Sequence, residues 1–127
     1  MDKIFLFDLA SRHADWASVR QATIAANIAN ANTPAYRAAD VEPFAKVLDR
    51  THLTPMRTSS GHLALGASEA ASAKVSDADS WEVSESGNTV SLDQQMVKSA
   101  QTSGAYTLNT SIVRAFHRMV LASVRNA

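Results

Sequence analysis

Cysteine is absent from this chain, which therefore contains no disulfide bond and no thiolate metal site. Glycine occurs only four times in 127 residues, and there is no phosphate-binding glycine loop, G-x-G-x-x-G motif or nucleophile elbow. Aromatic residues make up 6% of the chain, so a monomer has few large side chains with which to build a core. We therefore expect part of the stability to come from neighbouring chains.

A charge excess of either sign is also lacking, because 12 Lys and Arg residues balance 12 Asp and Glu residues. Without a net field to attract polyanions, we expect no nucleic-acid partner. No apolar run approaches the roughly 20 residues that span a bilayer, so direct membrane insertion is not expected. The run Ile4–Phe7 follows a single lysine and lacks the cleavage site of a Sec signal peptide. On these residues alone, the default location is the cytoplasm.

Residue types that carry metal or acid–base chemistry are scattered along the chain. The four histidines stand at positions 13, 52, 62 and 117 without metal-ligand spacing, although His13 and His117 would meet if the terminal helices paired in a suitable register. The acidic stretch 77–85 lacks the glycine and the closing glutamate of an EF-hand. We expect no catalytic residue, metal site or cofactor, and no enzyme activity. A Ser/His/Asp set assembled only in space is the enzyme alternative that sequence leaves open.

Apolar residues at helical spacing predict a first long helix from about residue 3 to residue 31. Neither glycine nor proline interrupts this run, and Asp2 is suited to cap its N-terminus. A helix of about 29 residues would be ~43 Å long. That length exceeds the diameter of so small a domain, so we expect the helix to project or to pair along its length. The apolar positions are Leu6, Leu9, Trp16, Val19, Ile24 and Ile28.

A second long helix is expected from Ser91 to about Arg125. Its start fits a capping box, with Ser91 as N-cap and the Gln94 side chain reaching back. Gly104 lies inside the helix and indicates either a close helix approach or a bend. One stripe along this helix comprises Leu92, Met96, Ala100, Ser103 and Thr107, and a stronger one comprises Leu108, Ile112, Ala115, Met119 and Ala122.

The segment between the helices gives weaker signals. Pro43 is suited to open a short helix through Asp49, and the Ser-, Ala- and Gly-rich stretch 58–76 is expected to be a loop. Segments 74–76 and 80–84 are expected to form short strands of a small β-hairpin, with a turn at 86–88.

The predicted fold class is mainly α. Long N- and C-terminal helices pair as a coiled coil or helical hairpin, and they bury their apolar stripes against each other or against other subunits. An irregular middle segment holds the short helix and the small hairpin. Residues 1–36 and 91–127 then form one discontinuous helical assembly domain and residues 37–90 the middle segment, within a single structural unit.

The stretch Ile24–Arg37, IAANIANANTPAYR, is the most informative in the chain. Helix propensity does not explain its three asparagines, because Asn side chains compete with the helix backbone for hydrogen bonds. Asn27 and Asn30 are three residues apart, so their amides share one helical face and can bond to a neighbouring segment. Thr33 and Pro34 then end the helix, because Pro34 has no N–H and disfavours helical geometry at the residue before it.

These residues resemble the N-terminal signature of bacterial flagellar rod, hook and hook-associated proteins. The resemblance is carried by RQATIAANIANANTPAYRAADVEPF, residues 20–44, in which the matching positions are Asn27, Ala29, Asn30, Thr33, Pro34 and Tyr36. Ala35 stands where the family usually has glycine, so we expect a turn that tolerates a Cβ. The segment SGNTVSLDQQMVKSAQ, residues 86–101, and the short length are similar to the short proximal rod subunits of that family.

The resemblance implies a structural subunit of the proximal rod, which polymerises through its terminal helices into the axial drive shaft that transmits torque. It implies a location in the periplasmic rod of the flagellar basal body, reached through the flagellar type III export apparatus without a cleaved signal peptide. The implied partners are other copies of the chain, other rod proteins, the rod-to-ring adapter and the membrane-supramembrane ring. A generic cytoplasmic coiled-coil adapter is the alternative.

The expected assembly residues come from the motif and from both long helices. Trp16 is placed by its helical spacing in the core or, in an assembly, at an interface, and Tyr36 is expected to fix the turn against a neighbouring helix. The full set is Trp16, Asn27, Asn30, Thr33, Pro34, Tyr36, Leu92, Met96, Leu108, Ile112 and Met119.

Overall fold

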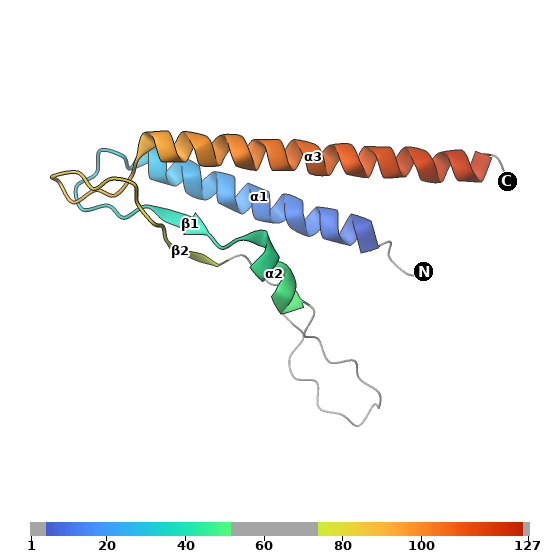
Figure 1. Cartoon of the computed structure of the whole chain (residues 1–127), viewed down its shortest axis with the longest axis horizontal. Helices are drawn as coiled ribbons and strands as arrows, with labels where there is room; N and C mark the ends of the chain where they lie inside the picture. Colours follow the sequence, from blue (N-terminus) through green and yellow to red (C-terminus); the bar gives the residue numbers. More distant parts are fainter. Residues whose placement is uncertain (1–4, 52–73, 126–127) are drawn as a thin grey trace, which may run out of the picture.

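The computed structural model describes residues 5–51 and 74–125. Two long helices, α1 (Phe5–Ala29) and α3 (Leu92–Arg125), lie side by side and run in opposite directions (Figure 1). Two short strands and the short helix α2 (Phe44–Thr51) come between them in the sequence. Both described ends of the chain lie at the same end of this pair, and the turns that join α1, the strands and α3 gather at the other end. The predicted mainly helical fold with paired terminal helices and a small middle sheet is confirmed.

Helix α1 ends at Ala29, two residues before the predicted end. The Asn30 N–H still donates to the Ala26 and Asn27 carbonyls at 3.2 and 3.1 Å, and the Thr33 N–H donates to the Asn30 carbonyl at 3.0 Å. The chain therefore leaves the helix through tightening turns rather than at Pro34 itself. The predicted N-cap, Asp2, lies outside the described residues.

Helix α3 begins at Leu92, as the Ser91 cap predicts. The Gln94 N–H lies 3.5 Å from the Ser91 hydroxyl, but the Gln94 side chain donates to the Asp79 carbonyl at 2.9 Å instead of reaching back. The capping box is thus only half formed, and Gln94 ties the helix to the preceding segment. Gly104 does not mark a close approach, because a Cβ placed there would meet nothing within 4 Å.

The sheet is not the expected hairpin. Strand β2 (Val75–Asp77) pairs antiparallel with β1 (Ala39–Val41), with Ala39 opposite Asp77. Residues 80–84 form no strand, because the Ser80 hydroxyl bonds to the Thr89 carbonyl at 2.8 Å and closes this segment into a loop. A turn lies near the one predicted at 86–88, but it spans residues 84–87. It is closed by a hydrogen bond from the Gly87 N–H to the Ser84 carbonyl at 2.9 Å. The predicted loop lies outside the described residues from 58 to 73.

Helix α2 (Phe44–Thr51) follows Pro43 as predicted and closes a small apolar core against α1 and β1. Trp16 and Ala17 of α1 meet Val41 of β1 and Val47 of α2, and Phe44 packs against the cluster. The Trp16 indole N–H donates to the Glu42 carbonyl at 2.8 Å, so the one polar atom of the ring is satisfied.

Small and polar side chains, together with one aromatic pair, join α1 to α3. Asn27, Gln95 and Thr102 are buried between them, and the Asn109 amide donates to the Ala10 carbonyl at 2.9 Å. At the far end, the rings of Phe7 and Phe116 meet edge to face with centroids 5.7 Å apart. Of the two predicted ways of burying the apolar stripes, against each other or against other subunits, the single chain does not use the first for the stronger α3 stripe, whose Leu108, Ile112 and Met119 are exposed.

Candidate assembly site

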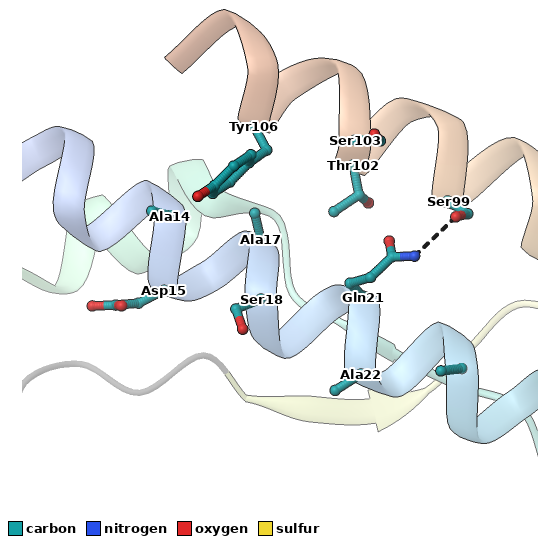
Figure 2. Close-up of a pocket in the computed structure, with 11 residues that line it drawn as sticks. Ala14, Asp15, Ala17, Ser18, Gln21, Ala22, Ser99, Thr102, Ser103 and Tyr106 are labelled. Atoms are coloured by element: carbon teal, nitrogen blue, oxygen red, sulfur yellow. Dashed lines mark hydrogen bonds between the residues drawn. The ribbon is translucent and has the colours of Figure 1, made fainter. Parts of the chain in front are cut away.

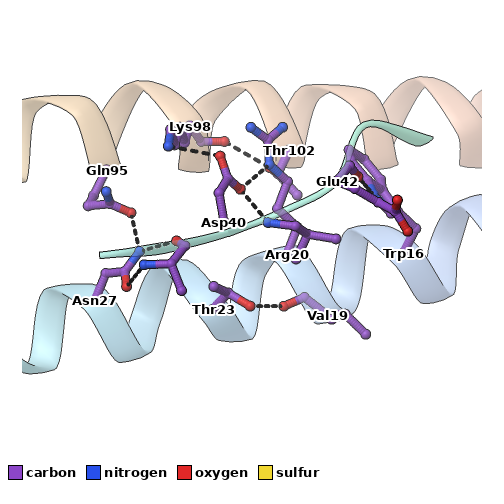
Figure 3. Close-up of polar contacts among 12 residues, drawn as sticks. Trp16, Val19, Arg20, Thr23, Asn27, Asp40, Glu42, Gln95, Lys98 and Thr102 are labelled. Atoms are coloured by element: carbon purple, nitrogen blue, oxygen red, sulfur yellow. Dashed lines mark hydrogen bonds and ion pairs between the residues drawn. The ribbon is translucent and has the colours of Figure 1, made fainter. Parts of the chain in front are cut away.

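The junction between α1, β1 and α3 is organised by the Asn27 side chain, which is fully buried. Its amide donates to the Ala39 carbonyl at 2.7 Å and accepts from the Ala39 N–H at 3.0 Å, so it pairs with β1 as a neighbouring strand would. The same amide donates to the Gln95 side chain of α3 at 3.0 Å (Figure 3). The Tyr36 hydroxyl lies 3.4 Å from the Asn27 oxygen. One residue thus joins three elements, as the motif predicts for an amide aimed at a neighbour.

The other signature residues act more locally. The Asn30 side chain donates to the Ala26 carbonyl of its own helix at 2.8 Å and accepts from the Thr33 hydroxyl at 3.2 Å. Pro34 is exposed and follows this turn. Tyr36 is half-buried and holds the turn against α1, the helix from which the turn emerges. The structure therefore gathers these residues around the end of α1.

Asn88 completes the same junction and was not singled out from the sequence. This buried amide donates to the carbonyls of Asn30, Ala31 and Thr33 at 2.9, 3.0 and 2.7 Å, and its oxygen accepts from the Val90 N–H at 2.7 Å. It thereby binds three carbonyls of the turns that follow α1, of which the Asn30 carbonyl also accepts from the Thr33 N–H at 3.0 Å. No sequence pattern identifies this role, because the partners lie more than fifty positions away.

Ala35 takes the left-handed conformation, with φ of 58°. The turn therefore keeps the geometry that glycine favours and does not change to one suited to a side chain, contrary to expectation. Its N–H donates to the Ser86 carbonyl at 2.9 Å, and a Cβ added to Gly87 would lie 3.7 Å from the Ala35 Cα. Two left-handed residues, Ala35 and Gly87, thus lie where the two turns touch.

Ala35→Gly is expected to raise the free energy of unfolding by about 1 kcal/mol, because it removes the steric cost of the left-handed conformation. Gly87→Ala, at φ of 77°, is expected to lower it by a similar amount, about 1 kcal/mol. Urea unfolding of both variants measures the effect. Changes of the same sign in the two variants would contradict this account.

An ionic cluster lies beside the Asn27 junction. Asp40 of β1 accepts from Arg20 of α1 at 3.2 Å and from Lys98 of α3 at 2.8 Å, and its carboxylate also accepts from the Val41 N–H (Figure 3). Burial alone would raise the pKa of Asp40, but the hydrogen bonds from Lys98 and Arg20 outweigh it and hold the pKa below its ordinary value. The sequence did not reveal this cluster, since its members lie on three separate elements.

Stability should depend on pH through Asp40. Because its folded-state pKa is depressed, its contribution is present above the ordinary value of 3.8 and is lost as pH falls through the lower folded value. The difference in unfolding free energy between wild type and Asp40→Asn should therefore shrink as pH falls below about 4. Urea titrations of both proteins across that range test this. A difference that stays constant would show that the ion pairs contribute nothing.

Histidine 13 responds in a separate pH range. Its ring packs edge to face on Phe44 at 4.8 Å, and its Nδ1 is buried without a hydrogen-bond partner. Burial lowers the pKa of His13 from 6.5, so its neutral form is favoured in the folded chain and protonation opposes folding below about that pH. Comparing wild type with Asp40→Asn at each pH cancels this contribution.

The stronger predicted stripe of α3 faces solvent. Leu108 and Met119 are each 62% exposed and Ile112 is 46% exposed. These residues recur at spacings of four and seven along an unbroken helix, which is the pattern of a coiled-coil seam without its partner. Leu92 and Met96, of the weaker stripe, are also exposed. Trp16 differs from all of these, because it lies in the core within the chain.

A groove of about 780 Å³ runs between α1 and α3 on the side where small residues face each other. Ala17 and Ala22 line it from α1, Ser99 and Ser103 from α3, and Tyr106 lies at one end (Figure 2). The Gln21 amide crosses the groove to the Ser99 hydroxyl at 3.0 Å. Since small side chains leave room between helix backbones, the groove can accept a side chain from another molecule.

Within residues 5–51 and 74–125, no group of three or more His, Cys, Asp or Glu side chains could hold a metal ion. In the same part of the chain, no helix combines the length and the apolar character that crossing a membrane requires.

Comparison with known proteins relates this chain to the flagellar basal body. Residues 16–37 match the family model described as flagella basal body rod protein, a range that includes Trp16, Asn27 and the turn to Tyr36. The whole chain is 43% identical, over 129 residues, to the flagellar basal body rod protein FlgB of Agrobacterium fabrum strain C58. That alignment covers 98% of this chain and 96% of the relative, so the similarity extends over both helices and the segment between them.

Proposed function

Because this chain belongs to the family of flagellar basal body rod proteins, we propose that its two long helices build the rod by packing against neighbouring subunits. The chain is a structural subunit of the basal body rod and assembles there with other rod and basal body components. The generic adapter alternative is not favoured, because the similarity runs through the entire chain rather than through a helical motif alone.

The observation that carries the polymerisation proposal is the exposed seam of α3. A single chain leaves Leu108, Ile112 and Met119 in solvent on one face of an otherwise regular helix. Contiguous exposed apolar surface is characteristic of an interaction site, and burying three such side chains is favourable by roughly 25 cal/mol per Å² of apolar surface. The α1–α3 groove supplies a second surface with room for side chains of a neighbour.

Residues 1–36 and 91–127 act in this proposal as the assembly domain, with residues 37–90 facing outward. The proposed partners are further copies of the chain, other rod proteins, the rod-to-ring adapter and the membrane-supramembrane ring. The proposed location is the periplasmic part of the rod. The proposed route is the type III export apparatus, without a cleaved signal peptide and without enzymatic chemistry.

Ile112→Asp is expected to abolish rod assembly and swimming while costing the isolated chain no more than about 1 kcal/mol of unfolding free energy, because Ile112 is 46% exposed in the monomer. The test is complementation of a deletion strain, with swimming and isolated basal bodies scored by electron microscopy, and urea unfolding of the purified variant. Thr107→Asp, exposed on the same helix but off the seam, is the control. Normal rods with Ile112→Asp would remove the α3 seam from the proposal, and normal rods in the deletion strain itself would remove the rod function.

A further inference from the structure

A second groove, of about 650 Å³, lies between the start of α1 and the second half of α3. Its apolar part comes from Phe7 of α1 and Val113 of α3, and three cationic or titratable side chains of α3, Arg114, His117 and Arg118, line it as well. None of these three makes an ion pair with another described residue, and all three are exposed. From residue 99 to residue 125, α3 contains no Asp or Glu. We call this hollow the basic groove.

The opposite end of the molecule carries the complementary surface. Between β2 and α3, Trp81 is 67% exposed and Val83 is 63% exposed, and neither packs into the core. Two exposed carboxylates, Glu82 and Glu85, alternate with them and form no ion pair within the described part of the chain. Residues 78–97 contain no Lys or Arg. We call residues 81–85 the acidic tip, since it belongs to the connection between β2 and α3 (Figure 1).

We propose that the acidic tip of one copy docks into the basic groove of a second copy, so that successive copies contact one another head to tail. Trp81 and Val83 would cover Phe7 and Val113, and Glu82 and Glu85 would meet the arginines of the groove. The match is one of both charge and apolar surface, which is how protein interfaces acquire their partner and register. The inference rests on the proposed rod function for its biological setting.

We assign a second copy as the occupant because the acidic tip cannot reach the basic groove of its own chain. The residues that line the basic groove come from the start of α1 and the second half of α3, so they lie toward the described termini. The tip belongs to the other end of the pair, where the turns gather (Figure 1). The groove residues of α3, at positions 111–118, lie ~29 to 39 Å along this helix from its start at Leu92, which is where the tip joins it. Two different complementary surfaces at opposite ends give a heterologous contact, which generates a ring or, where the rotation does not close, an open helical assembly, and not a symmetric dimer. A rod requires this type of contact.

The test uses three charge reversals in the full-length purified chain. Glu82→Lys changes the tip and Arg118→Glu changes the groove, while Asp49→Lys, at an exposed site on α2, is the control. By sedimentation velocity at low ionic strength, wild type and Asp49→Lys should self-associate, and added salt should weaken that association. Each of the other two variants should associate about tenfold more weakly, because like charges then face each other across the contact.

Mixing the two weakened variants distinguishes docking from a general charge effect. In an equimolar mixture, each reversed tip can meet a reversed groove and each native tip a native groove, so association should return to the wild-type level. A mixture that stays monomeric, or single variants that associate as wild type does, would overturn the proposal. A wild-type chain that remains monomeric at every concentration would overturn the assignment of a second copy and leave another rod subunit as the occupant.

Complementation separates this inference from the proposed function. If the wild-type gene restores rods in a deletion strain and Glu82→Lys and Arg118→Glu restore them equally well, rod function stands and head-to-tail docking is wrong. If the wild-type gene is not needed for rods, the proposed function fails independently of the charge reversals.

Discussion

Asn27→Leu is expected to lower the free energy of unfolding by about 3 kcal/mol, because it leaves several buried polar groups without partners. The Asn27 side chain is 0% exposed. Leucine is similar in size but pairs with neither the Ala39 N–H nor its carbonyl, which bond to the amide at 3.0 and 2.7 Å. The Gln95 oxygen would also lose its donor at 3.0 Å. Urea unfolding monitored by circular dichroism measures the loss.

The matched control is Asn32→Leu, three residues beyond the end of α1 and exposed. It makes the same chemical change in the same motif, yet it should alter the unfolding free energy by no more than about 0.5 kcal/mol. Asn30→Leu should fall between the two, because that amide bonds only to the Ala26 carbonyl and the Thr33 hydroxyl. Equal losses at positions 27 and 32 would show that the motif stabilises the chain through local helix termination rather than through the three-element junction.

Local patterns were sufficient to predict both long helices. The start of α3 follows from the Ser91 cap, and the end of α1 follows to within two residues from the Asn-rich run before Pro34. That Asn27 faces a neighbouring segment was also predictable, because a buried amide in a helix needs a partner outside it. These features depend on residues a few positions apart, which is why sequence alone reveals them.

Features that depend on distant segments were not predictable. The β-hairpin prediction failed because β2 found a better partner in β1, whose Ala39 is already held by Asn27. The contacts of Asn88 and of the Asp40 cluster depend on where the turns bring distant segments back to the helices. The spacing of residue types along the sequence does not predict those positions. Sequence periodicity predicted the residues of the α3 stripe but not whether that stripe faces α1 or solvent. The face of α3 that packs on α1 carries small and polar residues such as Thr102 and Gln95 instead.

Trp16→Ala is expected to cost about 3 to 5 kcal/mol in unfolding free energy, the usual range for truncating a buried aromatic side chain. Because the core is small, this loss is a large fraction of the total free energy of unfolding. Trp16 packs with Ala17, Val41 and Val47, and its indole N–H donates to the Glu42 carbonyl at 2.8 Å. Trp16→Phe keeps most of the apolar area and removes that bond, so it should cost less than Trp16→Ala.

Trp81→Ala is the control that the chain itself provides, because Trp81 is the second of only two tryptophans. At 67% exposed, its truncation should change monomer stability by about 0.5 kcal/mol or less. The two variants also serve as fluorescence probes: the chain that retains only Trp16 should emit at shorter wavelength in the folded state than the chain that retains only Trp81. Similar emission from both, or a large stability loss only at position 81, would mean that α1, β1 and α2 do not enclose Trp16, and the small core would have to lie elsewhere.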